Sequence, residues 1–228
     1  ANDCSLRGAI IKANTSAGMD TINVPAGTYN LTVLGAGEDA AATGDLDITD
    51  DLVLAGAGAA TTIIDGGQFD RVFHSDPAGT GTISVTIRDV TVQGGATVVI
   101  SFVLSDGGAI RNGSSNTLGS NTGGTLTVMN SVVRNSSTPR AGGGLANVGT
   151  LVLIDSTVAG NTAGTHGGGI FQDDPGALSL TGTTVSGNTA SQLGGGIFSG
   201  AFSISTDPLV TLTASTVSGN TGAGIHLN

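Results

Sequence analysis

Hydrophobic and polar positions alternate in short segments that recur along this chain. In one such segment Leu178 and Leu180 are two residues apart, and Val185 follows after a polar gap. Period-two spacing of Leu, Val, Ile and Thr predicts β-strands rather than helices. Four segments are near-copies of one another and a fifth fits with one residue missing: Val85–Gly95, Leu151–Asn161, Leu178–Asn188 and Val210–Asn220, and then Leu126–Asn135.

A second short apolar segment follows a cluster of glycines in most repeats, at Gly144–Ala146, Gly169–Phe171, Gly196–Phe198 and Gly224–His226. Glycine and asparagine permit the sharp bends that such short strands need. The starts of successive copies lie 41, 25, 27 and 32 residues apart, a spacing typical of stacked supersecondary units. The pattern therefore predicts an all-β fold, a right-handed single-stranded parallel β-helix (solenoid) of about eight or nine coils.

An asparagine recurs at one position of the repeat. The residues are Asn135, Asn161, Asn188 and Asn220. We expect an internal ladder in which the side-chain amides hydrogen-bond from coil to coil at a bend. The alternative is a row of surface ligands.

The first residues differ from everything that follows them. Leu6, Ile10 and Ala13 fall at helical spacing, and Ser5 is suited to be the N-cap. We expect residues 4–14 to form a short capping helix that covers the first coil, with the β-helix coils over residues 20–228. The whole chain, residues 1–228, is then one domain.

The motifs near the N-terminus are Cys4–Ile10, Ala13–Asn14, Asp20–Ile22, Pro25–Tyr29, Gly44–Ile48 and Thr62–Asp65. Together they resemble the CSLREA domain of bacterial secreted proteins, and the later glycine repeats are similar to those of polymorphic outer-membrane proteins. The resemblance covers nearly the whole chain. Gly8 stands where the family motif has Glu, and only three residues precede the motif. The resemblance implies a secreted or surface-attached protein and no established catalytic residues.

The acidic composition of the chain limits the kinds of partner that it is expected to bind. The formal net charge is −10 and the pI is about 4.2, which disfavours binding to nucleic acid or to an anionic membrane surface. No apolar stretch is long enough for a transmembrane segment. We expect an extracellular or cell-surface location, where divalent cations can neutralise the acidic surface.

Carboxylates occur in groups that suit calcium. Asp45 and Asp47 are two residues apart and are the candidate metal ligands, and calcium is the cofactor that such ligands are expected to bind. The alternative, which the absence of a full calcium-loop motif favours, is a solvated turn over Asp45–Asp51. His74, His166 and His226 have no carboxylate at metal-ligand spacing, so each is interpreted as a surface or bend histidine.

The aromatic content argues against a polysaccharide enzyme. There is one Tyr and no Trp, whereas sugar-processing clefts usually present aromatic platforms. Phe171 and Phe198 share a repeat position and are interpreted as a stacked core ladder. Arginines such as Arg71 and Arg111 are expected to pair with the surplus Asp. No catalytic residue is therefore predicted.

The favoured function is a non-enzymatic structural or adhesive protein. The chain stops within a repeat, which predicts end-to-end self-association into a surface filament, with cell-surface components as other partners. The residues expected at the assembly ends are Cys4, Leu6, Ile10, Ile225 and Leu227. Two alternatives stay open: a polysaccharide lyase or hydrolase with its site along Asp45–Asp76, and a passive stalk or passenger fragment of a larger surface protein.

Overall fold

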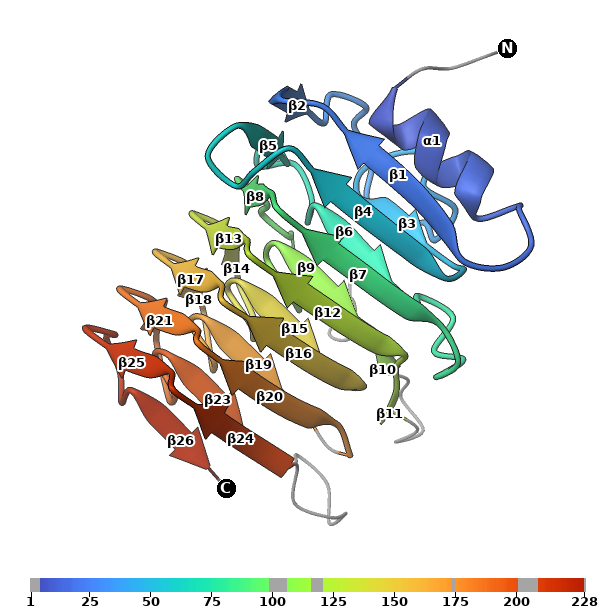
Figure 1. Cartoon of the computed structure of the whole chain (residues 1–228). Coiled ribbons are helices and arrows are strands. Elements are labelled where there is room, and N and C mark those ends of the chain that lie inside the picture. Colours follow the sequence, from blue (N-terminus) through green and yellow to red (C-terminus); the bar gives the residue numbers. More distant parts are fainter. Residues whose placement is uncertain (1–4, 99–105, 116–120, 174, 201–208, 228) are drawn as a thin grey trace.

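A computed structural model describes residues 5–98, 106–115, 121–173, 175–200 and 209–227. The regular structure is one short helix and many short strands, most of them in parallel sheets (Figure 1), so the all-β prediction is confirmed. Within the described residues, no helix is long and apolar enough to span a membrane.

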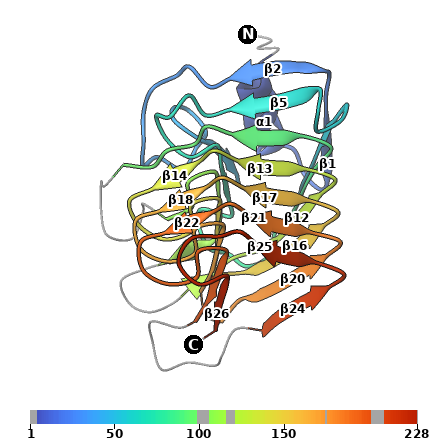
Figure 2. The ribbon, with the colours of Figure 1, turned by 90° about the vertical axis from the view of Figure 1, so that its left-hand side faces the viewer.

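Three seven-stranded parallel sheets make up most of the molecule, and each repeat contributes one strand to each sheet in turn (Figures 1 and 2). The first sheet contains β1 (Asp20–Val24), β4 (Leu52–Gly56), β7 (Ser84–Arg88), β12 (Thr125–Met129), β16 (Thr150–Ile154), β20 (Ala177–Thr181) and β24 (Leu209–Thr213). The second contains β2 (Gly27–Asn30), β5 (Thr62–Asp65), β8 (Thr91–Gln93), β13 (Val132–Arg134), β17 (Thr157–Ala159), β21 (Thr184–Ser186) and β25 (Thr216–Ser218). The third contains β3 (Leu46–Ile48), β6 (Phe73–Ser75), β9 (Ile110–Asn112), β15 (Leu145–Asn147), β19 (Ile170–Gln172), β23 (Ile197–Ser199) and β26 (Ile225–Leu227).

Two smaller sheets complete the strands. One is parallel and joins the bends of three repeats: β14 (Ser137–Thr138), β18 (Thr162–Ala163) and β22 (Thr189–Ala190). The other is an antiparallel pair, β10 (Ser114–Ser115) and β11 (Asn121–Thr122).

Each strand of the three large sheets pairs in parallel with its equivalent in the next repeat, as expected. Leu151, for example, lies opposite Leu126 on one side and Leu178 on the other. The described sheets contain seven strands rather than the eight or nine predicted coils. The difference arises because connections such as residues 31–45 use many residues without adding a strand.

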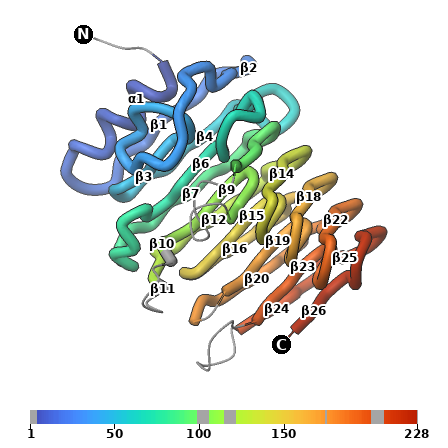
Figure 3. Tube along the Cα trace, turned by 180° about the vertical axis from the view of Figure 1, so that it is seen from behind, coloured from blue at the N-terminus to red at the C-terminus, as the bar shows by residue number. Residues whose placement is uncertain are grey.

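The main hydrophobic core lies between the three sheets. Alternate residues of each strand point into it, as in Val85 and Ile87 of β7, which are both fully buried. Helix α1 (Leu6–Ala13) lies beside β1 at the N-terminal end (Figures 1 and 3), and its Leu6 and Ile10 join the same core. Ser5 is its N-cap and accepts a hydrogen bond from the Gly8 amide at 3.0 Å, as predicted.

The asparagine ladder is confirmed over three of its four members. Asn161 donates a side-chain hydrogen bond to Asn188, and Asn188 donates one to Asn220, each at 3.0 Å. The inclusion of Asn135 was wrong. No residue is missing from its repeat, and Ser136 therefore stands at the ladder position and donates its amide to Asn161 at 3.1 Å.

Gly168 shows why glycine clusters precede the third-sheet strands. A Cβ atom on Gly168 would lie 2.3 Å from the carbonyl oxygen of Gly195, in the backbone of the next repeat. The two segments approach this closely because the Gly168 amide donates to Gly194 O at 3.0 Å. The glycine is therefore required by the contact between repeats at this point.

Candidate functional site

The middle residues of the third-sheet strands form a row that continues from repeat to repeat. Side chains alternate along a strand, so this row points away from the main core that receives Leu46, Phe73 and Ile110. The row begins with charged and polar residues and ends with aromatic ones. In order it contains Asp47, His74, Arg111, Ala146, Phe171, Phe198 and His226.

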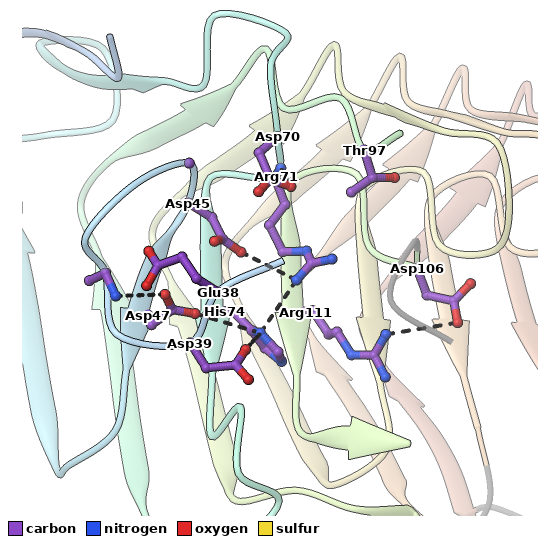
Figure 4. A network of polar contacts seen from close by, with 12 residues as sticks. Glu38, Asp39, Asp45, Asp47, Asp70, Arg71, His74, Thr97, Asp106 and Arg111 are labelled. Carbon is purple, nitrogen blue, oxygen red and sulfur yellow. Dashed lines mark hydrogen bonds and ion pairs between the residues drawn. The ribbon is translucent and has the colours of Figure 1, made fainter. Parts of the chain in front are cut away.

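The charged end of the row is almost completely buried. Asp47, His74 and Arg111 are 0%, 2% and 3% exposed. Asp47 and His74 are direct neighbours across β3 and β6, and His74 and Arg111 across β6 and β9. A buried ionisable group must be paired or hydrogen-bonded to be tolerated, so the contacts of these three residues define the candidate site (Figure 4).

His74 is held in one orientation. Its Nε2 lies 3.1 Å from the carbonyl oxygen of Gly113, and its Nδ1 lies 3.3 Å from Nη1 of Arg71. A carbonyl only accepts and a guanidinium only donates. Nε2 therefore carries the proton, and Nδ1 presents a lone pair towards Arg71, Asp47 and Asp39.

Two carboxylates face that lone pair. Oδ1 of Asp47 and Oδ1 of Asp39 each lie 3.7 Å from Nδ1 of His74. The other oxygen of Asp47, Oδ2, accepts a hydrogen bond from the Ala41 amide at 2.7 Å. Oδ1 of this fully buried side chain has no hydrogen-bond partner among the described residues. Asp39 is different, because its side chain is 60% exposed.

Arg71 lies beside this group and pairs with Asp45. Its Nη1 is 3.2 Å from Oδ2 of Asp45, and both side chains are buried. Asp70 is also buried and accepts the Arg71 amide hydrogen at 2.8 Å. The pairing of Arg71 with a surplus Asp is therefore confirmed, as is that of Arg111 with Asp106, whose charged atoms are 4.0 Å apart.

The connection before β3 brings Asp39 to the site. Glu38 stabilises this connection by accepting hydrogen bonds from the amides of Ala40 and Thr43. Arg7 of helix α1 holds it from the other side, with Nη1 donating to the carbonyl oxygens of Ala41 at 2.7 Å and of Asp45 at 2.9 Å. The helix thus fixes the segment that carries the acidic residues.

Burial controls the ionisation of these groups. It raises the pKa of Asp45 to about 7, although the Arg71 guanidinium opposes the rise. Burial, assisted by the charge of Asp45, raises the pKa of Asp47 to about 8. Burial lowers the pKa of His74 well below its ordinary value, and Arg71 and Arg111 lower it further. At neutral pH His74 is therefore uncharged.

Some sequence interpretations of these residues were wrong. Asp45 and Asp47 do not belong to a solvated turn, because they are 2% and 0% exposed. His74 is not a surface or bend histidine, because it lies inside the cluster. Both errors have one cause: residues of different repeats cover these side chains, and this packing depends on the register between repeats.

The aromatic end of the row is a stack, as predicted. The rings of Phe171 and Phe198 are 5.6 Å apart at 15°, and those of Phe198 and His226 are 5.3 Å apart at 13°. His166 also contacts Phe198, at 4.7 Å. The two phenylalanines are buried in a small hydrophobic core cluster with Ala141 and Ala146, separate from the main core.

The residues predicted at the two assembly ends differ in their exposure to solvent. Leu6 and Ile10 belong to helix α1 and are buried against the main core, whereas Ile225 and Leu227 are 38% and 63% exposed. Cys4 lies outside the described residues.

The Arg71–Asp45 pair allows a first prediction. Replacing Arg71 by Met should lower the free energy of unfolding by about 2 kcal/mol, because a buried carboxyl loses its partner. The loss is moderated because Asp45 can take up a proton, given its raised pKa. Urea unfolding measures the change.

Arg88→Met is the matched control. Arg88 pairs with Asp89 at the surface and is 41% exposed, so its replacement should cost less than about 1 kcal/mol. Equal losses for the two variants would show that burial does not strengthen the Arg71 pair.

Comparison with known proteins adds no assignment: no family model matches the chain, and no curated protein matches it.

Proposed function

We propose that this chain is a right-handed single-stranded parallel β-helix of the CSLREA type, acting as a non-enzymatic structural or adhesive protein outside the cell. The observation that carries the proposal is the unbroken in-register pairing of equivalent strands across all three large sheets. Such pairing builds a scaffold whose surface is extended by stacking units.

End-to-end association of copies is the proposed mode of assembly. Among the described strands, β24, β25 and β26 each pair with the preceding repeat on one side. The last described repeat also exposes apolar side chains, with Leu209 at 68% and Leu227 at 63%. A parallel edge strand with apolar side chains can pair with a further strand, and in the proposed filament that strand comes from a second copy.

Negative-stain electron microscopy, with and without millimolar calcium, tests this assembly. We expect filaments with an axial repeat of one subunit length, and we expect Leu227→Asp to abolish them. Leu193→Asp is the control, because Leu193 is 40% exposed but lies in an earlier repeat. Isolated short rods at high protein concentration would contradict end-to-end assembly.

A second candidate is an enzyme that acts on an acidic glycan. Its supporting observation is the pKa of Asp45 near 7, since a general acid is most effective when its pKa lies near the working pH. Burial of Asp45 and Asp47 opposes this role. Cleavage of an acidic polysaccharide that is lost in Asp45→Asn would support the enzyme over the scaffold.

A further inference from the structure

Three potential metal ligands converge at the exposed margin of the charged cluster. The closest oxygens of Asp39 and Asp47 each lie 3.7 Å from Nδ1 of His74, and all three atoms lie within 4.8 Å of one another. These distances are too long for hydrogen bonds. Ligands of a tetrahedral ion with bonds of 2.0–2.2 Å are about 3.3–3.6 Å apart, so small movements of Asp39 and of the Asp47–His74 pair close the geometry.

The histidine is prepared for metal binding. Nε2–H of His74 donates to the carbonyl oxygen of Gly113, and the lone pair of Nδ1 faces the two carboxylates. Metal-binding histidines characteristically donate their second ring N–H to a backbone carbonyl or a carboxylate, which fixes the tautomer and the ring orientation. Gly113 supplies that contact here from the neighbouring repeat.

Asp47 provides an independent observation. Its side chain is fully buried, and its Oδ1 lies 3.7 Å from Nδ1 of His74 with no hydrogen-bond partner in the described part of the chain. A buried polar atom without a partner is costly, and here Oδ1 of Asp47 and Nδ1 of His74 face each other across 3.7 Å, too far for a hydrogen bond. A cation between them would satisfy both atoms at once.

The charge balance of the cluster also favours a cation. Carboxylates outnumber guanidinium groups among the residues that line it (Figure 4), with Arg71 and Arg111 against five acidic side chains: Glu38, Asp39, Asp45, Asp47 and Asp70. Arg111 additionally faces Asp106. A cation beside Asp39 and Asp47 would therefore lie among more acidic than basic side chains.

We propose that Asp39, Asp47 and His74 bind one transition-metal dication of the zinc type, independently of the scaffold role. Imidazole suits zinc and its neighbours, whereas calcium takes oxygen ligands in larger number. Asp45 is not a ligand, because it faces Arg71. Exposed Asp39 forms the entrance, and water completes the coordination there.

Arg71 competes with the ion. Its Nη1 approaches Nδ1 of His74 to 3.3 Å, within reach of the same lone pair. Metal binding requires Nη1 to leave His74 and keep its contact with Asp45. Removing the guanidinium therefore tightens metal binding, an effect that a purely structural role of these residues does not produce.

The test begins with chelator-treated protein, titrated with zinc and with calcium by calorimetry. Visible absorption of added Co²⁺ reports the coordination geometry independently. We expect one zinc per chain, no heat from millimolar calcium, and the intense spectrum of four-coordinate cobalt. Asp39→Asn should weaken zinc binding by at least about tenfold, and its exposed position leaves folding intact.

Three variants complete the design. His74→Gln should weaken zinc binding and remove the cobalt spectrum, and Arg71→Met should tighten zinc binding. Asp155→Asn is the control, because it removes one exposed carboxylate in another repeat and should bind zinc as the unmodified chain does. The proposal would be overturned if the unmodified chain did not bind zinc. It would also be overturned if Asp39→Asn and His74→Gln bound zinc as strongly as the unmodified chain does.

Discussion

Gly168→Ala is expected to be among the most damaging single substitutions in the described part of the chain. It should lower the free energy of unfolding by at least about 4 kcal/mol or prevent folding. The added methyl group would lie 2.3 Å from Gly195 O and 2.5 Å from the backbone of Thr189. These atoms belong to the next repeat, so relief requires the two repeats to separate and weakens the pairing of β19 with β23. Urea unfolding followed by circular dichroism measures the loss.

Gly219→Ala is the control that separates the steric clash between repeats from the cost of a left-handed backbone conformation. Gly219 has a φ of +62°, but no atom lies within 4 Å of the position of its Cβ. Alanine there should cost about 1–2 kcal/mol, which is the cost of a left-handed backbone conformation. If both variants lost the same stability, the close approach of the repeats at Gly168 would not be the reason for its glycine.

Asn188→Leu is expected to lower the free energy of unfolding by about 3–4 kcal/mol. The substitution preserves approximate size but removes four hydrogen bonds of a fully buried side chain. Oδ1 of Asn188 accepts from the amide and from Nδ2 of Asn161, and its Nδ2 donates to Val158 O and to Asn220. Each buried group left without a partner costs about 1–3 kcal/mol, and partial rearrangement limits the sum. Thermal and urea unfolding both measure the change.

Asn135→Gly is the matched control. Asn135 is exposed and has a φ of +51°, and Gly160 stands at the equivalent position in the next repeat. Glycine accepts this conformation without strain, so the variant should change stability by no more than about 0.5 kcal/mol. A loss below about 1 kcal/mol in Asn188→Leu would contradict the importance of the ladder.

The repeats themselves could be predicted because they depend on local rules. Period-two alternation placed β16 and β20 correctly. The asparagine ladder of Asn161, Asn188 and Asn220 followed from their equal position within the repeats. The N-cap at Ser5 followed from its side-chain chemistry. These features require only that each unit resembles the next.

The charged cluster could not be predicted in the same way. Asp47 and His74 become neighbours only once β3 and β6 are paired, and Asp39 arrives through a connection whose path no repeat determines. One signal was present: a charged or polar residue stands between two residues of a short, mainly apolar segment, as in Leu46–Ile48 and Phe73–Ser75. This charged or polar residue stands at the same strand position as Phe171 in the aligned repeats, so its side chain belongs to the same row.

The change along that row, from charged side chains through Ala146 to stacked rings, divides the molecule into two kinds of unit. The units carrying Phe171 and Phe198 have matching strands, since β16, β17 and β19 align without offset with β20, β21 and β23. Such modules can be duplicated or exchanged by recombination, altering the length of the molecule in whole steps. The charged units do not share this freedom, because Arg7, Asp47, His74 and Gly113 each occur in a different module and must be inherited together.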